Sequence, residues 1–362
     1  MEEQANMSEL DINRVNIMMG SKCNFNCRHC IQTDAMKFEN SKTTYEQAFI
    51  CIEHLVNIRP SFKPKLTLMF WGGEPLCYMD IIDQFVQRLE DKVQYSIVTN
   101  GSLLTSQLVD YFNTHKFKVV LSNDGKYTDH VRPFNMLEND DFVRLFKRLD
   151  DKAIDACITA YNQDYYALWD YIESKLGKDI WVNHEMLECT WDMPEDLYDF
   201  DFDAYEQTMK SIIVDARKAV DNRKANRPLM LIEDMVRRIA RIAEKGEIGL
   251  RCSQMQSMIS IDLAGNVYAC HNGCGLLGTV NDEFEKLYTN FSLHFREKDN
   301  SDCNACPYLA ICGYGCLNSM PSKGKEACCK LKKIFFNACL DFIRSTETTF
   351  EEVDMEDSYD CN

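Results

Sequence analysis

The sequence predicts an α/β protein whose parallel sheet is open or curled toward a barrel, followed by a smaller cysteine-rich region. Two observations support this fold class. Short apolar runs alternate with amphipathic segments through the first half, and the cysteines crowd into the last third of the 362 residues. Repeated strand-then-helix units imply parallel strands joined by right-handed crossovers. A chain of this length has ample material for a buried core.

The expected elements follow one another in regular order. The strands are short apolar runs at 15–19, 66–70, 95–98, 119–121, 156–159 and 181–186. Segments with helical spacing of apolar residues lie between them, at 44–58, 79–91, 105–114, 140–149 and 163–176. An acidic, aromatic stretch at 191–206 precedes two further helices, at 204–222 and 228–245. From 250 onward the pattern changes to short strands, glycine-containing turns and cysteines.

This change of pattern predicts the domain organisation. We expect an N-terminal segment at 1–12, an α/β region at 13–200 and linking helices at 201–248. A cysteine-rich domain at 249–345 and an acidic tail at 346–362 complete the chain.

Composition excludes several classes of protein. The net charge of −17 argues against general nucleic-acid binding, which needs a basic surface. No apolar run approaches the ~18 residues of a membrane span, and the acidic N-terminus lacks the apolar core of a signal peptide. Eighteen cysteines without a secretion signal indicate a reducing, cytoplasmic location, where clustered cysteines are typical of metal sites.

Chemically distinctive residues follow each of the first four expected strands. In parallel α/β folds, catalytic and ligand-binding residues usually lie at the carboxyl ends of the strands. The first strand is followed by CNFNCRHC, in which Cys23, Cys27 and Cys30 form a CxxxCxxC motif. The next three are followed by Gly-Gly-Glu-Pro at 72–75, Thr-Asn-Gly at 99–101 and Ser-Asn-Asp-Gly at 122–125.

Three thiolates on one short loop can hold three irons of a 4Fe–4S cube. The fourth iron then lacks a protein ligand, and an open coordination position can bind a small chelating molecule. A zinc knuckle is the alternative interpretation of the same three cysteines.

The CxxxCxxC motif beside Gly-Gly-Glu resembles the radical S-adenosylmethionine (SAM) enzymes. The resemblance covers about residues 12–190 and implies a partial (β/α)6 TIM-like barrel with a SAM-binding 4Fe–4S cluster on Cys23, Cys27 and Cys30. It implies that the following residues line the SAM pocket: Gly72, Gly73, Glu74, Asn100, Ser122, Asp124 and Arg132. One departure is His29, where the family usually has an aromatic residue before the third cysteine.

The late cysteines have a specific spacing. Cys252, Gly265 and Cys270 form CX12GX4C, and a CX2CX5CX3C motif follows at 303–316. A double zinc ribbon would also use such pairs. The spacing resembles the SPASM domain of radical SAM enzymes, which implies short β-hairpins, helices and two auxiliary 4Fe–4S clusters, three clusters in all. The ligands implied are Cys252, Cys270 and Cys316 for the first, and Cys303, Cys306, Cys312 and Cys329 for the second.

The sequence leaves two cluster ligands undecided. Cys328 is an alternative to Cys329, and the first auxiliary cluster either takes Cys274 as its fourth ligand or keeps an open iron. The scattered cysteines are expected to be small buried hydrophobic residues, namely Cys51, Cys77, Cys157, Cys189 and Cys339.

The resemblance implies a function as well. Relatives most often cleave SAM to a 5′-deoxyadenosyl radical and oxidatively modify a ribosomally made peptide, so a thioether or carbon–carbon crosslink is the leading hypothesis. Dehydrogenation of a small molecule, sulfatase-maturase-like Ser or Cys oxidation, and a zinc-ribbon scaffold are alternatives. His271, which stands where sulfatase maturases commonly have Asp, is a candidate proton acceptor. Implied partners are a precursor peptide, a separate leader-binding protein and a flavodoxin or ferredoxin-type reductant.

Overall fold

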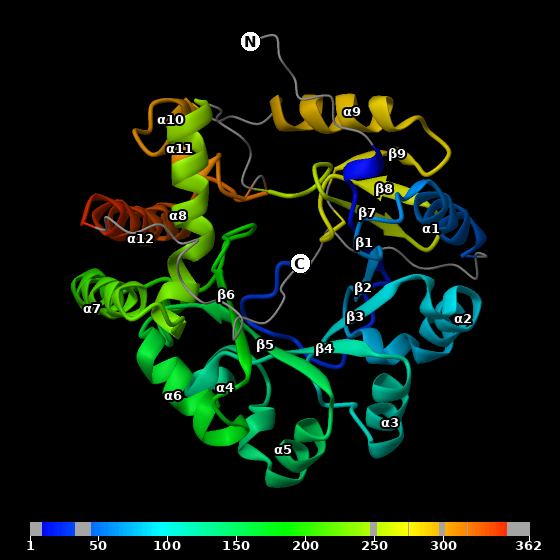
Figure 1. The fold of residues 1–362 in the computed structure, drawn as a ribbon, viewed down its shortest axis with the longest axis horizontal. Helices are drawn as coiled ribbons and strands as arrows, with labels where there is room; N and C mark the ends of the chain where they lie inside the picture. The colour runs from blue at the N-terminus through cyan, green and yellow to red at the C-terminus, as the bar shows by residue number, and fades with distance from the viewer. Residues whose placement is uncertain are drawn as a thin grey trace.

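A computed structural model describes residues 9–32, 45–246, 252–273, 275–296, 301–316 and 318–345. Its strands form a single sheet in the order β6-β5-β4-β3-β2-β1-β7-β8-β9. Strands β1 to β6 pair in parallel, and Figure 1 shows them along an arc with helices α1, α2, α3, α5 and α6 on its outer side. The predicted α/β class with a parallel sheet is therefore confirmed.

The alternation of strands and helices agrees closely with the sequence pattern. The strands are β1 (Arg14–Met18), β2 (Thr67–Trp71), β3 (Gln94–Thr99), β4 (Phe117–Ser122), β5 (Asp151–Ile158) and β6 (Trp181–Met186). The helices are α1 (Glu46–Ile58), α2 (Met79–Leu89), α3 (Ser106–Thr114), α4 (Thr128–Val131), α5 (Asp140–Lys147) and α6 (Tyr165–Leu176). β5 begins five residues before the expected run, because charged residues on its other face interrupt the apolar pattern.

Side-chain caps fix where several helices begin. The side chains of Thr105, Asn139 and Asp164 accept hydrogen bonds from backbone N–H groups in the first turns of α3, α5 and α6. Such caps satisfy donors that have no partner inside the helix.

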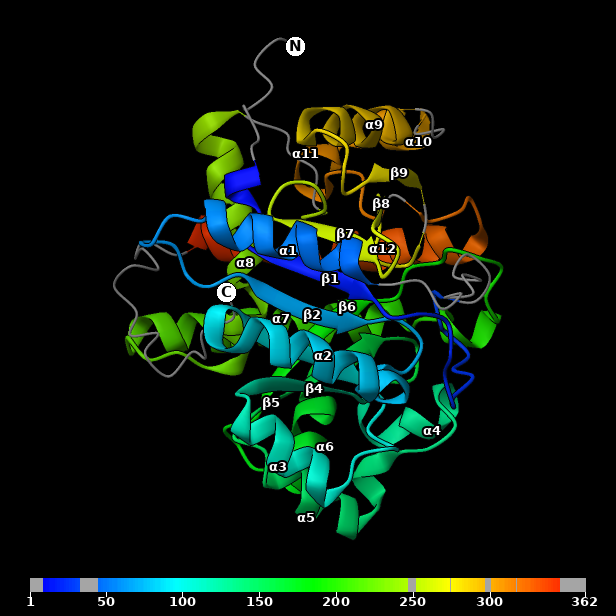
Figure 2. The same ribbon diagram turned by 90° about the vertical axis from the view of Figure 1, so that its right-hand side faces the viewer.

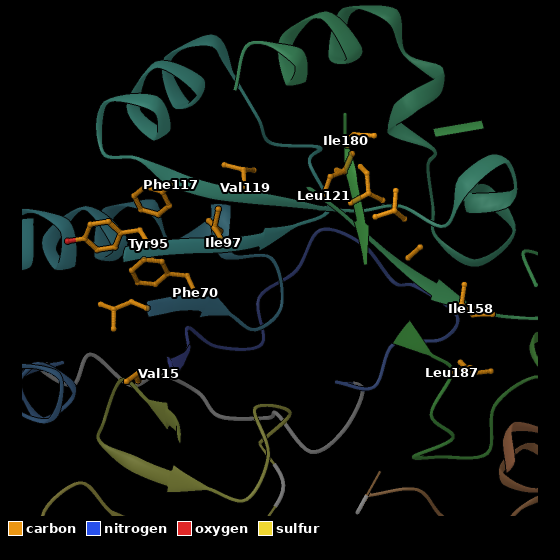
Figure 3. Close-up of a cluster of buried hydrophobic side chains, with 14 of the residues drawn as sticks. Val15, Phe70, Tyr95, Ile97, Phe117, Val119, Leu121, Ile158, Ile180 and Leu187 are labelled. Carbon is orange, nitrogen blue, oxygen red and sulfur yellow. The ribbon is translucent and has the colours of Figure 1, made fainter. Parts of the chain in front are cut away.

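The outer face of the sheet packs against the helices through aromatic side chains. The ring of Tyr95 stacks on Phe117 at 5.0 Å and on Phe70 at 6.4 Å between centroids. Figure 3 shows these rings in a row with Ile97 and Val119 from the same strands. Because side chains alternate along a strand, the residues between them point to the inner, concave face.

The second half of the chain continues the same sheet. β7 (Met258–Asp262) pairs in parallel with β1, and β8 (Asn266–Tyr268) and β9 (Leu276–Thr279) follow in antiparallel pairing (Figure 2). Helices complete this half: α7 (Phe202–Asp221), α8 (Arg227–Lys245), α9 (Phe284–Arg296), α10 (Ser301–Asn304), α11 (Leu309–Cys312) and α12 (Lys323–Ser345). α12 packs against α7 and α8. Among the described helices none is long and apolar enough to cross a membrane.

Candidate functional site

The first cysteine group lies on the loop that follows β1. Cys23, Cys27 and Cys30 are free thiols, and Cys23 is exposed. The loop is tied to neighbouring strand ends, since the Arg28 N–H donates to the Val131 carbonyl oxygen at 2.8 Å. Two further bonds join it to other loops, from Asn100 Nδ2 to Asn24 Oδ1 at 3.0 Å and from Trp191 Nε1 to the Cys30 carbonyl oxygen at 3.0 Å.

The three thiols share one electrostatic environment. The pKa of the Cys27 thiol is raised to about 11, chiefly by burial; Arg132 opposes this shift, and the Cys30 and Cys23 thiols contribute to it. Burial also raises the pKa of the Cys23 thiol. A metal centre on this loop would have to displace protons from these thiols, as metal binding to cysteine does generally.

The glycines after β2 allow a close approach to this loop. Gly72 and Gly73 have φ values of +106° and +33°, and a Cβ on Gly73 would overlap the Lys22 carbonyl oxygen. A Cβ on Gly72 would lie 2.9 Å from the Gly20 carbonyl oxygen. The two glycines therefore permit this loop and the cysteine loop to pack closely against each other.

Glu74 is buried between the ends of two strands. Its carboxylate accepts hydrogen bonds from Thr99 Oγ1 at 2.6 Å, the Asn100 N–H at 2.8 Å and the Leu76 N–H at 3.0 Å. Burial raises the pKa of Glu74, and these three donors counteract it. Glu74 thus joins the Gly-Gly-Glu turn to the Thr-Asn-Gly turn after β3.

Asp124 and Arg132 form a buried ion pair after β4. Arg132 Nε lies 2.6 Å from Asp124 Oδ2, and Arg132 Nη2 lies 3.2 Å from Oδ1. The Cys157 N–H also donates to Asp124, at 2.8 Å. Burial opposes the charge on Asp124, but Arg132 holds the pKa of Asp124 below its usual range. Ser122, the last residue of β4, is half-buried.

His29 sits buried beside this ion pair. Burial and, after it, the positive charge of Arg132 lower the pKa of His29 to about 4, so the imidazole is neutral at physiological pH. Its Nδ1 has no hydrogen-bond partner within the described residues.

The second cysteine group lines a cavity between α10, α11 and α12. Six cysteines line it, namely Cys303, Cys306, Cys312, Cys316, Cys328 and Cys329. The structure therefore brings together all four cysteines expected at the second auxiliary cluster, and it adds Cys316, which we assigned to the first.

Cys328 and Cys329 differ in their surroundings. Cys328 Sγ lies 3.8 Å from Cys189 Sγ, and both residues are buried. Cys329 is partly exposed; burial is the main cause of the raised pKa of its thiol, and Cys303 is close enough to contribute to it. These surroundings favour Cys329 over Cys328 as a ligand.

A buried lysine, which sequence patterns did not reveal as functional, lines the same cavity. Lys332 Nζ lies 2.5 Å from Glu188 Oε1, and Ser319 Oγ donates to Glu188 Oε2 at 3.0 Å. The sequence did contain a sign of this burial, because Lys332 lies on the apolar face of α12, between Leu331 and Phe335.

The remaining late cysteines flank the β7–β8 hairpin. Gly265 occupies its turn with φ +84°, and a Cβ there would lie 2.7 Å from Gln47 Cβ. Cys252 precedes β7 and acts electrostatically on Arg14 of β1, while Cys270 follows β8. Cys274 lies outside the described residues.

His271 packs edge-on against Trp71 at the end of β2, with ring centroids 4.6 Å apart and an interplanar angle of 84°. Burial lowers the pKa of His271 to about 4, and Arg14 contributes to the shift. The imidazole is therefore neutral at physiological pH, the state in which it can accept a proton.

Within the described ranges, no three His, Cys, Asp or Glu side chains are arranged to hold a single metal ion. A 4Fe–4S cube differs from a single ion in that each thiolate binds its own iron.

Comparisons with known proteins agree with this geometry. Residues 14–135 match a family model described as a 4Fe-4S single cluster domain. The chain is 23% identical to the radical SAM cyclopropyl synthase TigE of Paramaledivibacter caminithermalis, over 86% of this chain and 69% of TigE.

Solved structures share the fold. Native anSMEcpe with bound AdoMet matches with a TM-score of 0.66 and 18% identity, covering 91% of this chain and 98% of that one. SuiB of Streptococcus suis bound to its precursor peptide SuiA matches with a TM-score of 0.60 and 16% identity, covering 86% and 73%. The chain is thus a homologue of radical SAM enzymes and has the fold of their SPASM-containing members.

Proposed function

We propose that this protein is a radical SAM enzyme that oxidatively modifies a ribosomally made peptide. The observation that carries the proposal is the cysteine loop, whose three free thiols lie beside the Gly-Gly-Glu turn and near the Asp124–Arg132 pair. Three thiolates suit a 4Fe–4S cluster with one open iron. When bound there, SAM supplies a 5′-deoxyadenosyl radical that removes a hydrogen atom from the substrate.

The chain's own residues would hold and shield this chemistry. Cys23, Cys27 and Cys30 would bind the cluster, while Asn100, Ser122 and the ion pair of Asp124 with Arg132 would line the SAM pocket. Glu74 holds two of the strand-end turns together, which keeps the pocket walls in position. The protein's part is orientation of the substrate and exclusion of water.

We propose two auxiliary clusters, which makes three in all. Cys303, Cys306, Cys312 and Cys329 would hold one of them, and their common cavity supports this assignment. Cys252, Cys270, Cys274 and Cys316 would hold the other. Their part would be to accept the second electron of a net oxidation. His271 would then be a candidate proton acceptor beside them.

A peptide substrate is supported by what the relatives bind. SuiB was solved with its precursor peptide, and anSMEcpe with the Cp18Cys peptide. A cyclopropyl synthase forms a carbon–carbon bond, so the relationship to TigE favours a carbon–carbon link over a thioether. A flavodoxin or ferredoxin-type reductant and a separate leader-binding protein complete the proposed partners.

The test starts from anaerobically purified and reconstituted protein. We expect about twelve iron atoms per chain and formation of 5′-deoxyadenosine from SAM after reduction with dithionite. Cys27→Ala should abolish SAM cleavage and keep the auxiliary iron. Cys339→Ala is the matched control, because this buried cysteine lies outside both groups and should change neither readout. Zinc without iron would refute the proposal.

The peptide step needs its own measurement. The enzyme is incubated with SAM, dithionite and the peptide of the small open reading frame beside its gene. A product that has lost two hydrogen atoms, located by fragmentation to two side chains, would support a crosslink. An oxidised single side chain would point to the Ser or Cys oxidation instead.

A further inference from the structure

Two carboxylates lie side by side on the concave face of the sheet. Asp155 stands in β5 between Ile154 and Ala156, both buried in the core, so its side chain points to the opposite face. Glu185 stands in β6 next to His184, which contacts Trp169 of α6 on the helix side. Glu185 therefore shares the concave face with Asp155.

The register places the two carboxylates as diagonal neighbours. Asp155 pairs with Asn183, and Glu185 lies two residues further along β6. Asn183 Nδ2 donates to Asp155 Oδ1 at 2.8 Å, which confirms that these side chains share a face. The charge of Asp155 is the largest cause of a raised pKa at Glu185, so the two groups repel each other. Burial is the largest cause of the raised pKa at Asp155.

Among the described residues, no cationic side chain forms an ion pair with Asp155 or Glu185. Arg14 and Arg132 act on Glu185 from a distance, but neither forms an ion pair with it or with Asp155 among the described residues. Arg132 is engaged by Asp124, and Arg14 Nη2 points to Met258 Sδ at 3.2 Å. Glu188, which adds to the repulsion, is paired with Lys332. Glu185 is exposed, so a ligand can reach it.

Unpartnered polar atoms lie on the same concave face, on the strands at the other side of the arc. Asn16 Oδ1 in β1 and Ser96 Oγ in β3 have no hydrogen-bond partner within the described residues, although each residue is only 3% exposed. Their strand neighbours Val15, Ile17, Tyr95 and Ile97 belong to the core on the helix side. Buried polar atoms normally have a partner, so these two point to a ligand or ordered solvent on the concave face.

We propose that Asp155 and Glu185 form a binding subsite for a cationic group of the substrate, a primary ammonium or a guanidinium. Such a group carries several N–H donors and a positive charge, which matches two neighbouring carboxylates. Asn16 Oδ1 and Ser96 Oγ lie elsewhere on the same face, on β1 and β3. The inference rests on the proposed function, since a peptide substrate would carry this cation as a lysine or arginine side chain or as its N-terminal amine.

The test measures binding to the reconstituted full-length chain. The probes are Nα-acetyl-lysine N-methylamide and its apolar counterpart Nα-acetyl-norleucine N-methylamide, both at millimolar concentration in equilibrium dialysis. We expect the wild type to bind the lysine probe about tenfold more tightly, the ratio that a hydrogen bond to a charged group provides. Asp155→Asn with Glu185→Gln should remove this preference.

A control pair separates the subsite from overall charge. Asp141→Asn with Glu206→Gln removes two exposed carboxylates elsewhere and should keep the preference, because those side chains are 88% and 51% exposed. Equal retention of the two probes by the wild type, including no retention of either, would overturn the inference. So would a preference that survives in the Asp155/Glu185 variant.

Iron content and SAM cleavage are measured on the same preparations. A protein that cleaves SAM without preferring the lysine probe refutes the subsite alone. A protein that prefers the lysine probe but binds no iron refutes the proposed radical function and leaves the subsite standing.

Discussion

Replacing Arg132 by Leu should destabilise the carboxyl-terminal edge of the sheet, where the cysteine loop attaches. The substitution removes both contacts of the guanidinium and leaves the Asp124 carboxylate with the Cys157 N–H as its remaining donor. The two side chains are only 12% and 2% exposed, so water offers little screening. Breaking such a buried pair costs about 3 kcal/mol, at the low end of the usual range, which corresponds to about a hundredfold change in a local opening equilibrium.

Hydrogen–deuterium exchange gives a local readout of this cost. The Cys157 and Arg28 amides should exchange about a hundredfold faster in Arg132→Leu, because one donates to Asp124 and the other to the Val131 carbonyl oxygen. The effect should shrink as the pH falls, because protonation of Asp124 removes the unpaired charge. In the wild type the pKa of Asp124 is lowered, so its stabilisation is present above about pH 4 and is lost only as the pH falls through the lowered value.

A double variant identifies the cause. Asp124→Asn with Arg132→Leu removes the buried charge together with its partner, so most of the protection at Cys157 should return. Wild-type exchange in Arg132→Leu would refute the argument. So would a double variant that exchanges as fast as the single one, because then lost packing and not the unpaired carboxylate would be the cause.

Three further perturbations test other contacts. Gly73→Ala should cost at least about 2 kcal/mol of unfolding free energy in denaturant titration, since its Cβ would overlap the Lys22 carbonyl oxygen, whereas Gly177→Ala has open space around it and should cost about 1 kcal/mol. Lys332→Met should cost about 2 kcal/mol by the same measurement, because it leaves a partly exposed carboxylate unpaired; an unchanged midpoint would contradict this. Asp155→Asn with Glu185→Gln should leave stability near pH 4 unchanged and raise it increasingly toward pH 8. Both wild-type pKa values are raised by folding, so the wild type loses stability as the pH rises from about 4; parallel pH profiles would refute this.

Much of the fold follows from local pattern. Alternation of buried and exposed side chains marks β4, where Phe117, Val119 and Leu121 face the helices. The turn residues at the strand ends and the spacing of the cysteines indicate where the candidate site lies. Both signals are local, because they involve residues that are close together in the sequence. Three of the four cysteines that we propose as ligands of a second auxiliary cluster, Cys303, Cys306 and Cys312, are close in sequence and meet in one cavity. Cys329 reaches this cavity from the distant helix α12.

Other features depend on pairings between distant segments, which local pattern does not contain. β7 joins β1 although Met258 and Arg14 are far apart in the chain. The repulsion between Asp155 and Glu185 follows from the register of β5 on β6. The sequence shows each carboxylate as an interruption in an apolar strand, but only the register shows that the two are neighbours.

The pairing of β7 with β1 also bears on how this protein can be divided. The pattern change near residue 248 invites expression of the first part as an independent module. Yet β1 is an interior strand of the sheet, with Asn16 Nδ2 donating to Ser260 Oγ and buried residues along its length. A chain ending at 248 would present β1 as a bare, apolar edge, the kind of edge that recruits other chains into aggregates. The cysteine-rich half therefore also protects β1 from pairing with other chains, because β7 occupies the edge that β1 would otherwise expose.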